Sequence, residues 1–170
     1  MISGYLIGDR KLIAQLQGVP GAIQRDVAKT VDMLGLRLIA NVVSNQLSGQ
    51  VLKRRTGRLA ASIARGAKDT RSRFESTDTT ATSVVGTNVS YGRTWEFGAH
   101  VPAYEIFPKN ADALKFVMNG QTIFAKHVNM PARDIKARPY LAPALAAMKP
   151  LIIAELSAAA TRAAAAAIKP

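Results

Sequence analysis

The residues best suited to chemistry lie in the stretch YGRTWEFGAH, residues 91–100, of a chain in which only 6% of residues are aromatic. Glu96 stands between Trp95 and Phe97, and a carboxyl group among apolar side chains can act as a general acid. Acid-base catalysis needs a second titrating group, which the sequence does not supply. The simpler interpretation is an edge-strand acid that pairs with an arginine, either Arg93 or one from a neighbouring subunit.

Other signals for catalysis are weak. The two histidines, His100 and His127, are separated by a predicted hairpin and have no acidic motif close by, which favours structural or surface roles over metal binding. The absence of cysteine excludes disulfides and thiolate metal sites. No phosphate-binding loop, dinucleotide fingerprint, zinc-protease motif or serine-nucleophile motif is present. We therefore predict no enzymatic activity, no cofactor and no bound metal.

The net charge of +12 comes mainly from residues 51–73, where Asp69 is the single acid. The basic residues predicted to contact DNA or an acidic partner are Lys53, Arg54, Arg55, Arg65, Lys68, Arg71 and Arg73. Such residues can neutralise phosphates, and nearby aromatic side chains can stack on bases. Aromatics that alternate along a strand are more typical of packing. Non-specific nucleic-acid binding is therefore the alternative hypothesis for function.

The elements that must position these residues begin with a long helix over about residues 20–47. Its apolar residues recur at spacings of four and three, namely Ile23, Val27, Val31, Leu34, Leu38 and Val42. Further apolar residues widen this stripe, so we expect the helix to be covered on more than one side. Gly18, Pro20 and Gly21 predict a turn or helix start before it.

The rest of the chain predicts a basic segment and loop over about residues 51–82, then a sheet with hairpins over about residues 83–130. Residues 83–98 have the valines, aromatics and glycines of strands joined by tight turns, and Asn119-Gly120 predicts a two-residue hairpin turn. An alanine-rich helical region over about residues 143–168 follows, which Pro150 is expected to break or kink.

This order predicts a single α+β domain over residues 1–170, with a long central helix packed on a small, mostly antiparallel sheet and a C-terminal alanine-rich helix. The N-terminus lacks the pattern of a secretory signal. We expect no bilayer-spanning stretch, because the alanine-rich tail carries Glu155 and Arg162.

Three motifs in this order resemble a known family. They are TGRLAASI, with Thr56, Gly57, Arg58, Leu59, Ser62 and Ile63; YGRTWEFGAH, with Tyr91, Trp95, Glu96, Phe97 and Gly98; and KARPYLAPAL, with Arg138, Pro139, Tyr140, Leu141, Pro143 and Ala144. Together they are similar to the tail-completion or neck proteins of long-tailed bacteriophages and prophages, over about residues 20–150. The chain departs from that family at Tyr140, where phenylalanine is more frequent, and beyond Leu151, where no motif matches.

The resemblance implies a structural virion protein without catalysis or cofactor. It implies a homo-oligomeric ring, with a hexamer preferred over a dodecamer, in the neck between the capsid connector and the tail tube. The implied partners are other copies of the chain, head-completion or connector proteins, and tail terminator or tail tube proteins, with transient contact to packaged DNA and no membrane. Assembly would take place in the bacterial host cytoplasm.

In such a ring each subunit presents two different surfaces to its neighbours. The candidate interface residues are Arg58, Tyr91, Trp95, Glu96, Phe97, Arg138 and Tyr140. One hypothesis places Trp95, Glu96 and Phe97 at a subunit contact with Arg58 or its basic neighbours as partners, since aromatics and arginine are enriched in interface centres. The alternative places Trp95 and Phe97 in the core, with Arg58 paired to Glu96 inside one subunit.

Overall fold

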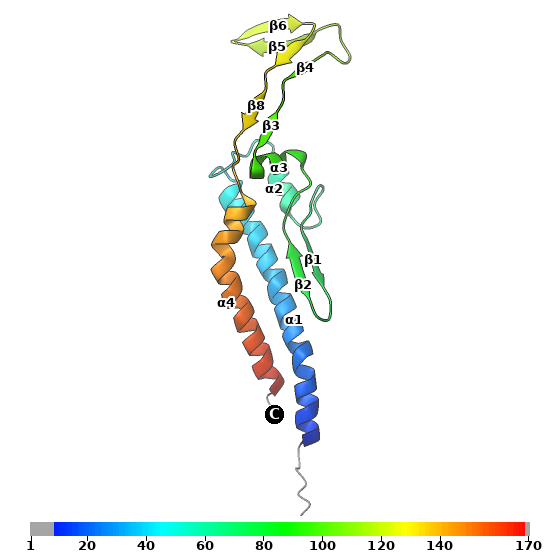
Figure 1. Ribbon diagram of the computed structural model, residues 1–170, viewed down its shortest axis with the longest axis vertical. Coiled ribbons are helices and arrows are strands. Elements are labelled where there is room, and N and C mark those ends of the chain that lie inside the picture. Colours follow the sequence, from blue (N-terminus) through cyan, green and yellow to red (C-terminus); the bar gives the residue numbers. More distant parts are fainter. Residues whose placement is uncertain (1–8, 169–170) are drawn as a thin grey trace, which may run out of the picture.

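The computed structural model describes the backbone of residues 9–168 and the side chains of residues 20–166. The molecule is elongated, with two long helices side by side, a hairpin along one of them and a narrow β extension at one end (Figure 1). The helices are α1 (Asp9–Asn41), continued by a π-helical turn η1 (Val42–Gln46), and then α2 (Arg58–Ile63), α3 (Ser90–Phe97) and α4 (Leu141–Ile168).

The strands form four separate antiparallel pairs within the described residues. These are β1 (Arg73–Ser76) with β2 (Ala81–Val84), β3 (Ala99–Val101) with β8 (Arg133–Ile135), β4 (Tyr104–Ile106) with β7 (Val128–Met130), and β5 (Leu114–Met118) with β6 (Gln121–Ala125). The last three pairs follow one another outward from the helices, and we call residues 99–135 the β-arm (Figure 1). The predicted α+β class with antiparallel strands and hairpins is confirmed.

The predicted hairpin at Asn119-Gly120 is present with the expected register. Phe116 lies opposite Ile123, and Leu114 lies opposite Ala125, so these half-buried side chains share one face. Asn119 and Gly120 both have positive φ, at 52° and 81°, as a two-residue turn of this kind requires. The alternation that predicted the hairpin therefore also set its register.

Helix α1 is covered on two sides, as the width of its apolar stripe predicts. Helix α4 packs along one side, and the β1–β2 hairpin packs along another (Figure 1). The hydrophobic core lies where the end of α1, α2 and the start of α4 meet, and its buried members are Ile39, Val42, Leu47, Leu52, Ala60, Ile63, Tyr140 and Ala144. This core holds together the elements that bear all three sequence motifs.

The helix start predicted near residue 20 and the break predicted at Pro150 were wrong. Helix α1 begins at Asp9 and passes through Pro20, where a turn or helix start was expected, and α4 runs unbroken through Pro150. Proline in a helix interior costs about 3 kcal/mol, but the leucine, alanine, lysine and glutamine residues around these positions are good helix formers. Favourable propensity on both sides, together with the packing of α1 on α4, offsets the local cost.

The strand predicted over YGRTWEF was also wrong, because these residues form α3. Gly92 and Glu96, four residues apart, are the buried residues of this helix, which is the spacing of one helical face. Gly98, with φ of 76°, ends the helix and donates its N–H to the Thr94 oxygen at 2.8 Å. The β-propensity of the aromatics suggested a strand, while the i, i+4 spacing and the terminal glycine indicated the helix.

By length and composition, α4 is the one helix in the described part of the chain that is apolar enough to cross a membrane, over Leu141–Ala166. This differs from the expectation that no stretch qualifies, because alanine keeps the hydropathy high despite Glu155 and Arg162. Only 11% of its most apolar window is buried within the molecule. Glu155 pairs with Arg37 of α1 at 3.3 Å, which ties the helix to the rest of the fold.

Gly35 allows the close approach of α1 to the β1–β2 hairpin. A Cβ atom at Gly35 would lie 2.9 Å from the Ser83 Cβ and 2.8 Å from the Arg65 Nη2 atom, whereas one at Gly21 of the same helix would meet nothing within 4 Å. We predict that Gly35→Ala lowers the free energy of unfolding by about 1–3 kcal/mol, because the hairpin must shift. Gly21→Ala should raise it by up to about 1 kcal/mol through helix propensity.

Urea unfolding followed by circular dichroism would measure both values. Equal effects of the two substitutions would contradict the close packing of the hairpin on α1.

Candidate assembly site

Glu96 caps the N-terminus of α4. Its Oε2 atom accepts hydrogen bonds from the backbone N–H of Tyr140 at 2.8 Å and of Leu141 at 3.0 Å, and its Oε1 atom accepts one from Ala142 at 2.9 Å. The first N–H groups of a helix have no partner within the helix, and the helix dipole favours negative charge there. Glu96 is only 8% exposed, so its carboxylate works inside the protomer and joins α3 to α4.

Two further contacts fix α3 against the start of α4. The Tyr140 side chain is 1% exposed, and its hydroxyl donates to the Gly92 oxygen at 3.4 Å. The backbone N–H of Arg138 donates to the Trp95 oxygen at 2.7 Å. Burial, together with the nearby Glu96 and Tyr91, raises the pKa of Tyr140 to about 12. The second and third sequence motifs therefore meet in one buried contact.

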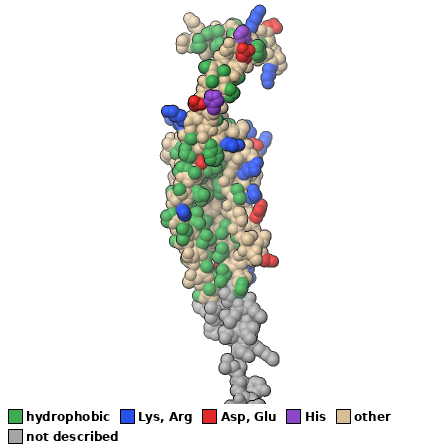
Figure 2. Space-filling view, in the orientation of Figure 1, with side chains coloured by type: hydrophobic (Ala, Val, Ile, Leu, Met, Phe, Trp, Pro, Cys, Tyr) green, Lys and Arg blue, Asp and Glu red, His purple; other side chains and the backbone are tan. Residues whose placement is uncertain are grey.

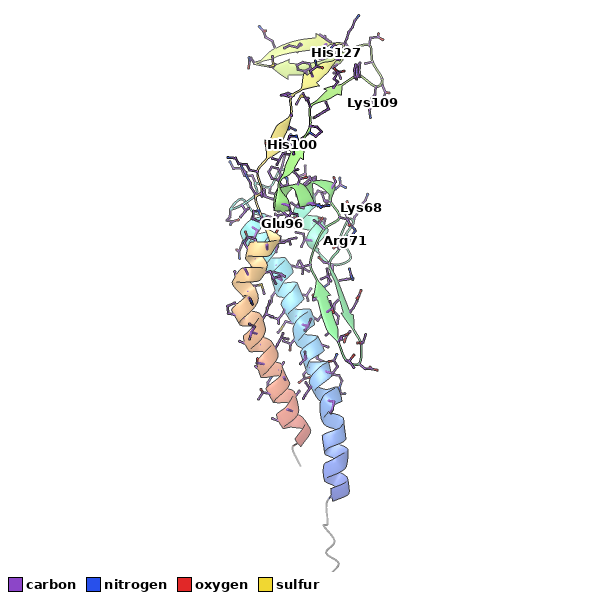
Figure 3. All side chains as sticks on the ribbon, viewed as in Figure 1. Lys68, Arg71, Glu96, His100, Lys109 and His127 are labelled. Carbon is purple, nitrogen blue, oxygen red and sulfur yellow. The ribbon has the colours of Figure 1, made fainter. Side chains whose placement is uncertain are left out.

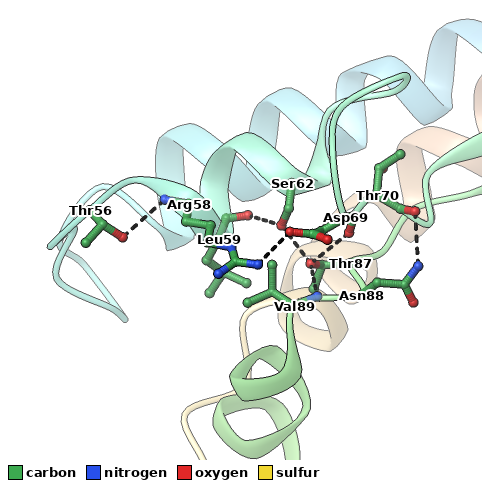
Figure 4. A network of polar contacts seen from close by, with 9 residues as sticks. All are labelled: Thr56, Arg58, Leu59, Ser62, Asp69, Thr70, Thr87, Asn88 and Val89. Carbon is green, nitrogen blue, oxygen red and sulfur yellow. Dashed lines mark hydrogen bonds and ion pairs between the residues drawn. The ribbon is translucent and has the colours of Figure 1, made fainter. Parts of the chain in front are cut away.

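The first motif is held by a second polar network, centred on Asp69 (Figure 4). The Arg58 Nη2 atom lies 2.7 Å from the Asp69 Oδ2 atom, and Asp69 raises the pKa of Arg58. The Asp69 backbone oxygen accepts the N–H of Asn88 at 2.7 Å, and the Ser62 and Thr87 hydroxyls lie 2.6 Å apart. This network connects α2 to the chain that enters α3.

These contacts correct two sequence interpretations. Arg58 pairs with Asp69 and not with Glu96, and Glu96 is a helix cap and not an edge-strand acid paired with Arg93. Phe97 is 75% exposed, which excludes the core position that one alternative gave it, while Trp95 is half-buried against the core. Sequence reasoning assigned Glu96 an arginine partner because no local pattern links it to backbone groups more than forty residues later.

Three members of the candidate interface line one groove. Tyr91, Trp95 and Arg138 line one groove with α2 and residues 47–57, and the Arg138 guanidinium lies 5.8 Å from the centre of the Trp95 ring. Lys53, Arg54 and Arg55 stand at the same groove. The sequence analysis paired the basic segment with this aromatic stretch across a subunit contact, whereas the structure places Lys53, Arg54 and Arg55 beside it within one protomer. The buried Leu47 and Leu52 also line the groove, a position that the sequence did not predict for them.

The other basic residues have separate positions. Arg65 is half-buried, pairs with Asp32, donates to the Ser83 hydroxyl at 3.1 Å and lies over the Phe74 ring, so it acts within the fold. Arg73 pairs with Glu75 at 2.6 Å, and Arg71 donates to Asn88. Lys68 is exposed and has no ion-pair partner among the described side chains. Three of the seven basic residues, Arg65, Arg71 and Arg73, are therefore engaged in contacts within the protomer.

The groups with catalytic potential do not come together in one place. His100 and His127 lie along the β-arm, apart from Glu96 at the junction of α3 and α4 (Figure 3). His100 pairs with Asp134 at 2.6 Å, and His127 packs on Phe107 with ring centres 5.9 Å apart. No cluster of three histidine or acidic residues that could hold a metal ion occurs within the described part of the chain.

Residues 10–98 match the model of a family described as "Bacteriophage HK97-gp10, putative tail-component". The chain belongs to this family of phage tail components. The match spans α1 through α3, so it includes the first two sequence motifs. No curated protein and no solved structure matched the chain. The resemblance found in the sequence is confirmed at the level of the family, and a structural role in a phage tail follows, with the virion as its location.

The Glu96 cap gives a direct stability prediction. Glu96→Ala should lower the free energy of unfolding by about 2–4 kcal/mol, because three backbone N–H groups lose a charged acceptor at a buried helix end. Thermal and urea unfolding would measure the loss. Glu105→Ala removes an exposed carboxylate from the β-arm and should change stability by less than about 0.5 kcal/mol. A Glu96→Ala variant as stable as Glu105→Ala would contradict the cap.

Tyr140 gives a prediction for alkaline pH. An unfolded tyrosine has a pKa of about 10, so the raised pKa of the folded state contributes stability that is complete below about pH 10 and is lost as the pH rises towards 12. The difference in stability between the wild type and Tyr140→Phe should therefore shrink over this range. Urea unfolding at several pH values would test this, with Tyr104→Phe, an exposed position, as control. A constant difference would contradict the assignment.

Proposed function

We propose that this tail component forms a closed homo-oligomeric ring, a hexamer, in the neck of the particle, where it joins the capsid connector to the tail tube. The observation that carries the proposal is the β-arm. A two-stranded ribbon alone is at best marginally stable in water, because it has no second layer to cover its faces. This arm leaves large apolar side chains uncovered, with Val117 70% and Phe124 66% exposed.

The body of the molecule offers a second uncovered apolar surface. Figure 2 shows hydrophobic side chains gathered over the face formed by the two long helices, and Leu145, Leu151 and Ile153 of α4 are exposed. Exposed apolar patches of this kind mark sites of protein contact. An arm at one end and an apolar helix face on the body are two different surfaces, which a head-to-tail ring requires. The family match supports a place in the phage tail, where such a ring would be assembled.

Under this proposal the candidate interface residues fall into two groups, those available to a neighbouring subunit and those engaged within the protomer. Tyr91, Phe97 and Arg138 are exposed and available to a neighbouring subunit or ring, whereas the exposed Arg58 is paired with Asp69 within the protomer. The side chains of Glu96 and Tyr140 are engaged within the protomer and support assembly by holding α3 in place. The whole chain would act as one neck domain, with connector proteins on one side and tail terminator or tube proteins on the other.

Non-specific nucleic-acid binding remains the second candidate. Lys53, Arg54, Arg55 and Lys68 form no ion pair with the described side chains and are exposed. Under the ring proposal these residues serve protein contacts, with at most transient contact to DNA during its passage. Tight binding of these residues to the DNA phosphates would slow that passage.

Electron microscopy and mass photometry of the purified protein, at low and high salt and without nucleic acid, would test the proposal. We expect closed rings of uniform copy number. Monomers that associate only on addition of DNA, and release it as the salt concentration rises, would contradict the ring and favour nucleic-acid binding.

The contribution of the β-arm can be tested separately. Phe124→Asp places a charge on the exposed face of the arm tip and should abolish ring formation without lowering the melting temperature, because the side chain has little burial to lose in the protomer. Thr79→Asp adds the same charge in the exposed β1–β2 loop and should assemble normally. Normal rings from Phe124→Asp would show that the arm does not mediate assembly.

A further inference from the structure

A groove of about 770 Å³ lies between residues 47–57, α2 and α3. The buried side chains of Leu47 and Leu52 and the half-buried Leu59 and Trp95 give it an apolar base. Lys53, Arg54, Arg55 and Arg138 stand around this base, and the described residues that line the groove include no acid. We call this feature the basic groove. Its volume lies within the range of cavities that bind specific ligands.

The basic groove gathers cations that form no ion pair with the described side chains, and none of the acids that do form ion pairs lies at the groove. Lys53, Arg54 and Arg55 are exposed and form no ion pair with the described side chains, while Asp32, Asp69, Glu75, Asp134 and Glu155 all pair with basic residues outside the groove. Glu96 caps α4. A chain with a net charge of +12 has few acids left to offer a second copy of itself.

The shape and polarity of the basic groove favour a peptide segment over duplex DNA as its partner. Duplex DNA presents phosphates on a convex surface and keeps its bases stacked inside, so it has nothing to place on a recessed leucine and tryptophan base. A peptide segment can insert an apolar side chain and direct carboxylates to the surrounding cations. Arginine and tryptophan are also the residues enriched at the energetic centres of protein interfaces.

We propose that the basic groove binds an acidic segment, with an aromatic or aliphatic anchor residue, from a different protein of the virion. The anchor packs on Leu59 and Trp95, and the acids pair with Lys53, Arg54 and Arg55. This inference rests on the proposed function for the identity of the partner as a virion protein. The groove itself belongs to one protomer, so its peptide binding can be measured whether or not rings form.

The single tryptophan of the chain, Trp95, lines the basic groove and so reports on its occupation. The first probe is a peptide of about ten residues with several glutamates around a central Phe-Leu pair, and the second is the same peptide with serines at that pair. The third is a peptide copying residues 103–109 of this chain, which tests a contact between copies of the chain. The fourth is an oligothymidylate of similar length, which tests binding of a general polyanion. We expect saturable binding of the first peptide with a change in Trp95 fluorescence, and binding of the other three that is roughly tenfold weaker or more.

Charge reversal tests the rim of the groove. Lys53→Glu combined with Arg55→Glu should lower the affinity for the first peptide by roughly tenfold or more, since two attractive contacts become repulsive. Lys109→Glu combined with Lys126→Glu makes the same change in net charge at exposed positions outside the groove lining and should bind like the wild type (Figure 3 labels Lys109). Circular dichroism would show that both double variants keep the fold.

Each other outcome would overturn the inference. Equal binding of the serine peptide or the oligothymidylate would make the groove a general surface for polyanions. Tighter binding of the peptide copying residues 103–109 would make it a contact between copies of this chain. A lack of binding by the first peptide, or equal losses in the two double variants, would leave no role for the groove in recognising an acidic segment. Ring formation in the electron microscope is unaffected by any of these results, so the two proposals fail separately.

Discussion

The three hydrogen bonds from the start of α4 to the Glu96 carboxylate are the interaction on which the rest of the structure depends. They satisfy a helix end that would otherwise be buried without partners, and they join segments that are distant in the sequence. The β-arm leaves the body and returns to it between these two points, because Gly98 ends α3 just before the arm and Tyr140 begins the turn into α4 just after it. One carboxylate thereby fixes the base of the arm and the direction of the last helix.

This internal use of the motif residues separates the scaffold from the surfaces left for assembly. Glu96, Tyr140 and the Arg58–Asp69 pair hold α2, α3 and α4 around a small core. These residues of the family motifs therefore act within the protomer. The β-arm, the apolar face of α4 and the basic groove remain uncovered. A monomeric protein rarely leaves so much apolar surface exposed, whereas a subunit of a tail assembly buries it against its neighbours.

The sequence predicted what periodicity and turn chemistry control. The apolar stripe of α1, the Asn119-Gly120 hairpin and the alanine-rich C-terminal helix were all visible, and three motifs indicated the family. The failures came where local patterns compete or where partners are distant. Helix α3 was mistaken for a strand because its aromatics favour strands, and the partners of Glu96 are backbone groups, which leave no trace in residue identity. The basic groove could not be predicted from the sequence, because residues 47–57, Tyr91 and Arg138 are distant in the chain and come together only in the folded protein.

The most direct test of this account is native-state hydrogen exchange of the backbone amides of Tyr140, Leu141 and Ala142, measured by nuclear magnetic resonance. Amides in the first turn of a helix normally exchange quickly, because they have no partner within the helix. The account predicts that these three exchange as slowly as amides in the buried part of α1, since all three donate to Glu96. Exchange at the rate of an uncapped helix terminus would contradict the cap and, with it, the fixed base of the β-arm.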